Sequence, residues 1–214
     1  MSVTNLPWRR IAAVAAVLSV ALFFFGTASL NPPMSATDQE VIDWWNDSGN
    51  QTMAIVSMYA FMFAGLFFLI FVTYLRVRLS GSGQDASILS TLMFAAGVMF
   101  ATMLAASGAS RGLIAAAVKL QDEQVPGLDT LRFIPQFSYV FISAALLAAG
   151  LMIAATTALI FRTSALPRWL GWLGVVAALL LFIGTPILQG LLIPVLLIWT
   201  LAASVAVWRD AGPA

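Results

Sequence analysis

The sequence of 214 residues contains no cysteine and no histidine. Without cysteine, the chain cannot form disulfides, thiol nucleophiles or thiolate metal sites. Without histidine, it also lacks the commonest ligand of zinc, copper and haem iron and the commonest general base near neutral pH. We therefore expect no catalytic residue, no metal site and no cofactor, and we predict that the protein is not an enzyme.

Charged residues are also scarce, at 9% of the chain, whereas 61% of the residues are hydrophobic and the mean hydropathy is +0.97. In a soluble domain, roughly a quarter of the residues are charged. The sequence therefore predicts a single integral membrane domain over residues 1–214. Its net charge of +1 provides no basic surface for nucleic acid. The expected partners are membrane lipids, with a protein partner or a second copy of the chain as a further expectation.

Long apolar stretches occur six times along the chain. A helix needs about 20 apolar residues to cross the bilayer core of about 30 Å, where lipid offers the backbone no hydrogen-bond partner. We therefore predict an all-α, polytopic transmembrane helical bundle. Its first span follows Arg9 and Arg10; the alternative is a signal peptide, but this apolar run is long for one. The predicted spans are 11–30, 53–74, 88–107, 137–161, 169–183 and 187–208.

The last two spans are separated by the short stretch "IGTPIL" at residues 183–188. We interpret Gly184 as the end of the fifth span, Thr185 as an N-cap and Pro186 as the first residue of the sixth span. Pro194 then falls inside the sixth span, where we expect it to kink the helix.

The loop charges predict how the chain is oriented. Arginine and lysine are concentrated in cytoplasmic loops of membrane proteins. An orientation with both termini in the cytoplasm places seven positive residues inside and three outside, and most acidic residues outside. The inner residues are Arg9, Arg10, Arg76, Arg78, Arg162, Arg168 and Arg209, and the outer ones are Arg111, Lys119 and Arg132.

Two short amphipathic helices are predicted on the outer face, and the first covers residues 38–47. Thr37 and Glu40 match the capping box at a helix N-terminus. Trp44 and Trp45 follow on one face, so we interpret this segment as an interfacial helix anchored in the outer leaflet by the two tryptophans. The alternative is a structured loop packed on the ends of the spans.

The second outer helix is predicted at residues 110–121, after a bend at Gly108. It carries Arg111 and Lys119, the only lysine of the chain. An arginine at the bilayer centre costs at least ~2.5 kcal/mol, whereas a long side chain at the interface can reach the headgroups. We therefore expect both charges at the membrane surface, with Lys119 beside Asp122 or Glu123 in an exposed ion pair of little energetic value.

None of the six predicted spans has an Asp, Glu, Lys or Arg in its middle. Proton-coupled carriers usually need such a residue, so this pattern argues against proton-driven transport. Several polar residues do fall near the outer ends of the spans, level with one another. If they line a cavity, it would accept a lipid headgroup or a small amphiphile; the alternative is a rim of polar residues beside the headgroups. These candidate binding residues are Arg111, Tyr59, Gln136, Tyr139 and Gln189, with Thr185 at the same depth.

Small residues recur every four positions in the third span, at Gly97, Ala101, Ala105 and Ala109. Such spacing allows two helix backbones to approach closely. Because the fourth span also carries closely spaced alanines, we expect the third and fourth spans to form the tight centre of the bundle. Gly171 and Gly174 suggest a further close approach by the fifth span.

The stretch "RTSALPRWLGWLGVVAALLLFIG" begins at Arg162 and contains Trp169 and Trp172, which we expect to be interfacial anchors. It resembles the C-terminal ending of uncharacterised multi-pass membrane proteins common in actinobacteria. The resemblance implies a bacterial plasma-membrane protein of unassigned activity, and it carries over no catalytic residue.

Three classes of function fit these patterns to different degrees. The favoured one is a non-enzymatic membrane protein that acts as an accessory or lipid-contacting module. The alternative is a transporter or channel for an uncharged or amphiphilic solute, with a cavity that opens to the outer face. The third, an intramembrane enzyme, would depend on outer acids such as Asp38, Glu40 and Asp43.

Overall fold

A computed structural model describes residues 6–28, 32, 35–81 and 83–209, with the side chains of residues 6, 7, 28, 189 and 190 excepted. Every regular element in these ranges is helical, so the all-α prediction is confirmed. The α-helices are α1 (Leu6–Ala28), α2 (Asp38–Asn46), α3 (Ser48–Leu79), α4 (Gln84–Leu120), α5 (Leu128–Phe133), α6 (Phe137–Thr163) and α7 (Arg168–Arg209), and the 3-10 helix η1 covers Ile134–Gln136.

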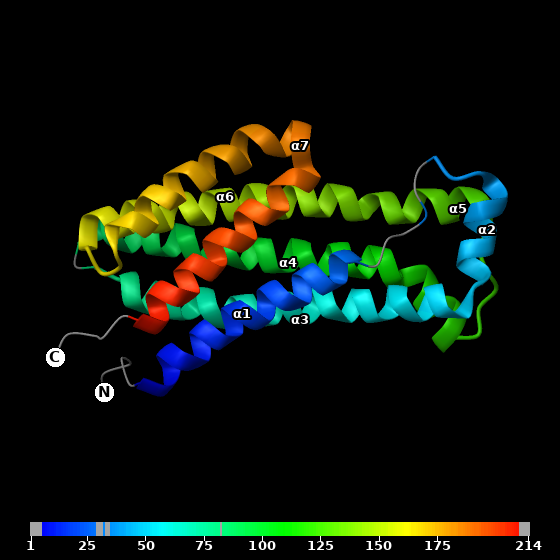
Figure 1. The fold of residues 1–214 in the computed structure, drawn as a ribbon, viewed down its shortest axis with the longest axis horizontal. Coiled ribbons are helices and arrows are strands. Elements are labelled where there is room, and N and C mark those ends of the chain that lie inside the picture. The colour runs from blue at the N-terminus through cyan, green and yellow to red at the C-terminus, as the bar shows by residue number, and fades with distance from the viewer. Residues whose placement is uncertain (1–5, 29–31, 33–34, 82, 210–214) are drawn as a thin grey trace.

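The long helices pack side by side in a bundle (Figure 1). Helix α1 packs against α3 and α7, and the series continues from α3 to α4, from α4 to α6 and from α6 back to α7. Helix α1 begins and α7 ends at one end of this bundle, which we call the terminal end. Helices α2 and α5 lie at the other, the capped end (Figure 1). The described chain contains six helical segments long and apolar enough to cross a membrane, as predicted.

A core rich in phenylalanine fills the bundle between these helices. Phe68 of α3 and Phe100 of α4 lie with their ring centroids 4.5 Å apart, and both side chains are buried. Met93, Leu146 and Trp199 belong to the same core. Because lipid tails are as apolar as these side chains, the helices associate through close van der Waals packing rather than through the hydrophobic effect.

Helix α7 contains both the fifth and the sixth span. The junction between them lies at a different residue from the one that the sequence predicted. The non-helical backbone angles lie at Leu188 (φ −130°, ψ 35°), four residues beyond Gly184, whereas Pro186 and Pro194 remain inside the helix. Thr185 donates its hydroxyl hydrogen to the Leu181 carbonyl one turn earlier, as a residue inside a helix does, and not as an N-cap. The expected stop at Gly184 and the cap at Thr185 were therefore wrong.

Helices α3 and α4 approach each other closely along their length. A Cβ atom added at Gly108 would lie 2.6 Å from Phe61 Cβ and 2.9 Å from the Met58 carbonyl oxygen, and one at Gly112 would lie 2.6 Å from Met58 Cβ. Helix α4 also packs along α6, as predicted. However, the glycines of α4 face α3, and Ala105 and Ala109 of the predicted stripe are only half-buried. The second and third spans thus form a tight pair in addition to the predicted packing of the third against the fourth.

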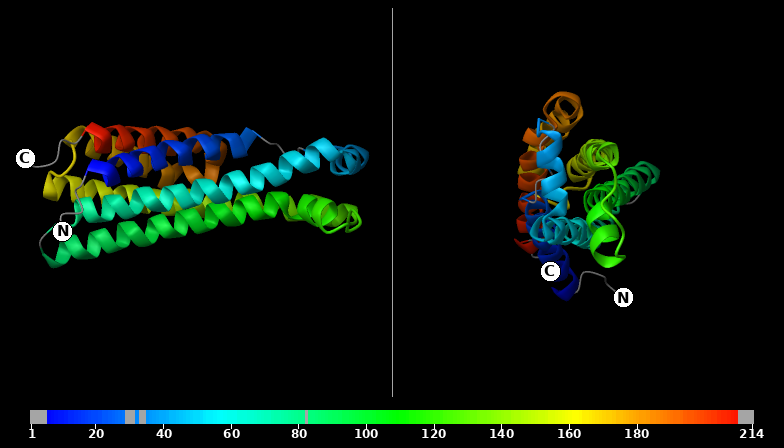
Figure 2. Two further views of the ribbon diagram at one scale, coloured as in Figure 1. Left: turned by 90° about the horizontal axis from the view of Figure 1, so that it is seen from below. Right: turned by 90° about the vertical axis from the view of Figure 1, so that its right-hand side faces the viewer.

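Helices α3 and α4 are much longer than a bilayer crossing requires. The 37 residues of α4 correspond to about 55 Å at 1.5 Å per residue, against a hydrocarbon core of about 30 Å. Both helices extend past the end of α1 toward the capped end (Figure 2). Residues 110–121 belong to this extension, and the helix runs through Gly108 up to Leu120. The prediction of a separate helix at 110–121 was wrong.

Candidate functional site at the capped end

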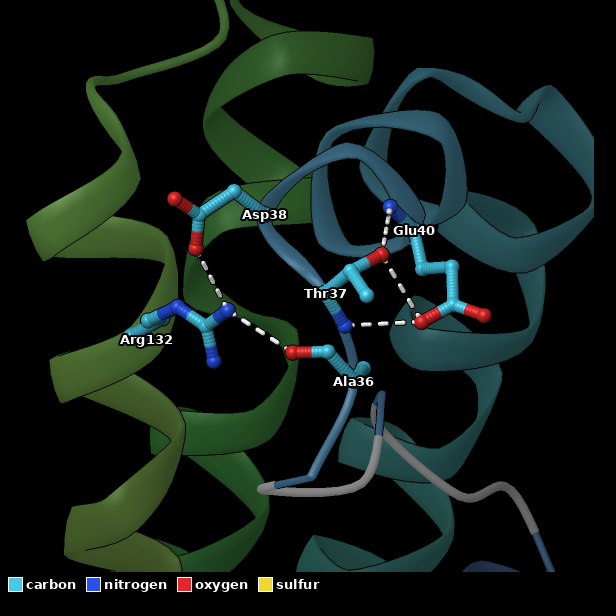
Figure 3. Close-up of polar contacts among 5 residues, drawn as sticks. All are labelled: Ala36, Thr37, Asp38, Glu40 and Arg132. Atoms are coloured by element: carbon cyan, nitrogen blue, oxygen red, sulfur yellow. Dashed lines mark hydrogen bonds and ion pairs between the residues drawn. The ribbon is translucent and has the colours of Figure 1, made fainter.

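Helix α2 begins with the capping box that the sequence predicted (Figure 3). The Thr37 hydroxyl oxygen accepts a hydrogen bond from the Glu40 amide at 3.3 Å, and the Thr37 amide donates to Glu40 Oε2 at 2.7 Å. The hydrogen bond from the Thr37 amide favours the ionised carboxylate, so the pKa of Glu40 lies below its ordinary value of 4.5. The reciprocal bonds satisfy backbone N–H groups that have no partner inside the helix.

The lowered pKa of Glu40 predicts an acid-sensitive α2. Because the folded-state pKa is depressed, the stabilisation is present above the ordinary value of 4.5 and is lost as the pH falls through the lowered pKa. The protection of the α2 amides from hydrogen exchange, measured relative to their intrinsic exchange rate at each pH, should therefore fall at acid pH. In Glu40→Gln, which keeps the capping geometry without a titrating group, this part of the loss of protection should disappear. The same acid response in both proteins would contradict the assignment to Glu40.

Arg132 of α5 joins the segment before α2 to the rest of the cap (Figure 3). Its Nη2 donates to the Ala36 carbonyl oxygen at 2.8 Å and to Asp38 Oδ1 at 2.7 Å. The Asp38 side chain is largely exposed, so the ion pair by itself contributes little stability. Arg132 instead fixes the position of this segment, because its guanidinium binds a backbone carbonyl and a carboxylate in the first turn of α2 at the same time.

The apolar face of α2 packs on protein. Val41 and Trp45 are 3% and 1% exposed and form a second core with side chains from three other helices. Trp45 is therefore not a bilayer anchor, and that prediction was wrong; Trp44 beside it is half-buried. The arrangement matches the alternative interpretation, a segment packed on the helix ends. The other members of this second core are Ala54 of α3, Ile114 and Ala115 of α4, and Leu131 of α5.

Lys119 connects the end of α4 to the beginning of α3. Its Nζ donates to the Ser48 carbonyl oxygen and to the Ser48 hydroxyl, both at 3.0 Å, and to the Thr52 hydroxyl. A cation in the last turn of α4 also interacts favourably with the dipole of that helix. The predicted pairing with Asp122 or Glu123 was therefore wrong, because the partners of Lys119 lie on a neighbouring helix.

Arg111 lies where α3, α4 and α6 meet. Its Nε donates to Ser138 Oγ at 2.8 Å, and its guanidinium carbon lies 5.2 Å from the centre of the Phe61 ring, within cation–π range. Ser138 Oγ is also 2.8 Å from Ser107 Oγ, and both serines are buried. A half-buried arginine thus binds together three helices through a polar cluster that the sequence did not reveal.

The position of Arg111 along α4 bears on the expectation that it lies outside the hydrocarbon. It follows Asp85, at the start of α4, by 26 residues, which is about 39 Å of helix and more than the bilayer core of about 30 Å. With Asp85 at one membrane surface, Arg111 lies at or beyond the other. This geometry agrees with the prediction that the Arg111 charge lies at the membrane surface.

The remaining candidate binding residues differ in how far they are exposed. Tyr59 and Tyr139 are 47% and 51% exposed, and Gln136 is half-buried; the side chain of Gln189 lies outside the described residues. Tyr139 does interact electrostatically with Arg111. Four grooves elsewhere on the described part of the bundle are not lined by any of these five, so a site at the candidate residues stays a prediction.

Opposite charges meet at the terminal end too. Arg162 of α6 pairs with Asp85 of α4 at 3.2 Å, with both side chains exposed. Trp169 and Trp172 begin α7 at this end and are 51% and 66% exposed, which leaves both available for the interfacial role predicted for them. In the described part of the chain, no three Asp or Glu side chains gather closely enough to hold a metal ion.

The fold defines a multi-pass α-helical membrane protein, with six candidate spans and a small folded cap at one end. Comparisons of the chain with protein-family models, curated protein sequences and solved structures found no match.

Proposed function

We propose that this protein is a non-enzymatic scaffold, an accessory module of the bacterial plasma membrane that holds a folded cap on the outer side. The observation that carries this proposal is the packing of the bundle. Large buried side chains from every long helix fill its core, and the described grooves open outward. Such a bundle is suited to holding other molecules in place rather than to passing them through.

The cap supports the same proposal. It is cross-linked by its own small core, by Arg132 and by Lys119, so α2 and α5 are fixed relative to α3 and α4. A surface preorganised in this way loses little conformational entropy when a partner binds. The charge pattern supports cytoplasmic termini: arginines cluster at the terminal end, and the capped end carries Asp38, Glu40, Asp43, Asp47, Asp122, Glu123 and Asp129.

A flux assay tests the proposal against the alternative of a transporter or channel. We expect purified protein in liposomes to leave the permeability to glycerol, urea and a fluorescent amphiphile equal to that of protein-free liposomes. The reason is that a packed core offers no continuous path. An unchanged melting temperature after reconstitution serves as the control for a folded sample.

Flux that rises with the amount of protein would contradict the scaffold and favour the transporter. In that case, loss of the flux in Arg111→Met, with retention in Tyr59→Phe, would place the path beside the Arg111 cluster.

A further inference from the structure

Two grooves follow each other along the seam between α1 and α7. The one nearer the terminal end has a volume of about 520 Å³, and the one nearer the middle of α7 has about 660 Å³. The lining residues of α1 recur at helical spacing through both grooves, at Val14, Val17, Ala21 and Phe24. Both therefore open on one face of α1 and follow each other along it.

Small residues at the bottom of the first groove explain why it exists. Ser204 of α7 donates its hydroxyl hydrogen to the Ala13 carbonyl oxygen at 2.9 Å, and both residues are buried. The walls are made by larger side chains that remain 40% to 48% exposed, namely Val14, Val17, Leu18 and Val205. The floor thus brings the helices together, while the walls leave a slot of methyl groups open to the bilayer.

The first groove differs from the other grooves in the charged and aromatic side chains at its terminal end. Trp208 and Arg209 line it at the terminal end, and the guanidinium of Arg10 lies 5.7 Å from the centre of the Trp208 ring. Among the residues that the structure describes, which end at Arg209, no acidic residue lines this groove. Tryptophan favours the headgroup level of a bilayer, and arginine binds phosphate oxygens through two parallel hydrogen bonds. An apolar slot therefore ends in two cations at the depth of lipid phosphates.

Two other grooves of the described chain lack this combination. The groove between α1 and α3 is lined by apolar, aromatic and hydroxyl side chains with no charged residue. The groove beside α6 at the terminal end contains Arg162, but this arginine already pairs with Asp85. Charge complementarity thus singles out the α1–α7 seam.

We propose that the α1–α7 seam is a binding site for one anionic phospholipid from the leaflet at the terminal end. One acyl chain lies in the slot between Val14, Val17 and Val205, and the phosphate is bound by Arg10 and Arg209 beside Trp208. The inference goes beyond the proposed scaffold function and does not depend on it, since a transporter with this seam would bind the same lipid.

Native mass spectrometry tests the site. The full-length protein is equilibrated in detergent with equal amounts of phosphatidylglycerol and phosphatidylcholine that carry identical acyl chains. We expect the one-lipid complex to favour phosphatidylglycerol, and we expect Arg10→Gln/Arg209→Gln to reduce that preference about tenfold, because charge-assisted hydrogen bonds to the phosphate are lost.

Two further variants make the outcome specific. Arg76→Gln/Arg168→Gln removes the same charge at the same end but outside the groove, so it should keep the preference. Val17→Phe fills the slot at an exposed position and should reduce the binding of both lipids. An equal loss in the two arginine pairs, or full binding in Val17→Phe, would overturn the proposal. A lipid-independent dimer that Val17→Phe abolishes would also overturn it, because a second copy would then occupy the seam.

Discussion

Replacing both Gly108 and Gly112 with alanine is expected to lower the melting temperature of the protein in detergent by roughly 5–15 °C. Each new Cβ would lie 2.6 Å from a Cβ atom of α3, and the Met58 and Ala54 carbonyl oxygens lie 2.9 Å and 3.1 Å from the two positions. These neighbours cannot rotate away, because they are backbone atoms or are attached directly to it. Helix α4 must therefore move away from α3, at about 1–3 kcal/mol for each overpacked site.

The intrinsic helix preference of alanine over glycine acts against this loss by roughly 0.5–1 kcal/mol at each site. A lower melting temperature of the double variant would therefore result from the steric clash between α4 and α3. Ala95→Leu provides the matched control, since it adds a larger group to an exposed position of the same helix and should leave the melting temperature close to that of the wild type. A double alanine variant that melts with the wild type would show that α3 and α4 are not in close contact here.

Replacing Trp45 with alanine is expected to unfold the cap and leave the membrane bundle folded. The indole is 1% exposed and packs in a core of only a few side chains, so its removal should cost the cap about 3–5 kcal/mol. Hydrogen exchange of α2 and α5 should accelerate strongly, while α1 and α7 should exchange as in the wild type. The effect is local because the core of the cap is separate from that of the bundle.

Trp44 supplies the control for this experiment. Its ring lies edge-on to that of Trp45 at 4.7 Å, but it is only half-buried. Trp44→Ala should therefore cost less, about 0.5–1.5 kcal/mol from the lost aromatic pair beyond the area that it buries. Equal protection losses in the two variants, accompanied by weaker membrane contact of α2, would instead support the outer-leaflet anchor.

The capping box and the spans were predictable because each depends on residues that are neighbours in the chain. Thr37 and Glu40 are three positions apart, and the bonds between them form wherever α2 begins. The missed features depend on other helices. An apolar stripe such as Val41 and Trp45 has the same spacing whether it faces lipid or protein, so its pattern could not show that α2 packs on α3 and α5.

Glycine caused a similar error in α4. Gly108 was interpreted as a bend because glycine weakens a helix in isolation. In the bundle it marks a place where α3 packs closely against α4, and the helix continues for another three turns. The partners of Lys119 were missed for the same reason, since Ser48 lies 71 residues earlier in the chain.

The sequence by itself determined the membrane class, the approximate spans and the placement of charge at the ends of the bundle. These properties follow from the transfer of side chains between water and hydrocarbon, which adds up residue by residue along each helix. The tertiary structure alone decided which helices touch, that a cap with its own core stands above α3 and α4, and that an apolar seam between α1 and α7 ends in two arginines. Those features depend on the register and the crossing of helices that are far apart in the chain, which local transfer energies do not specify.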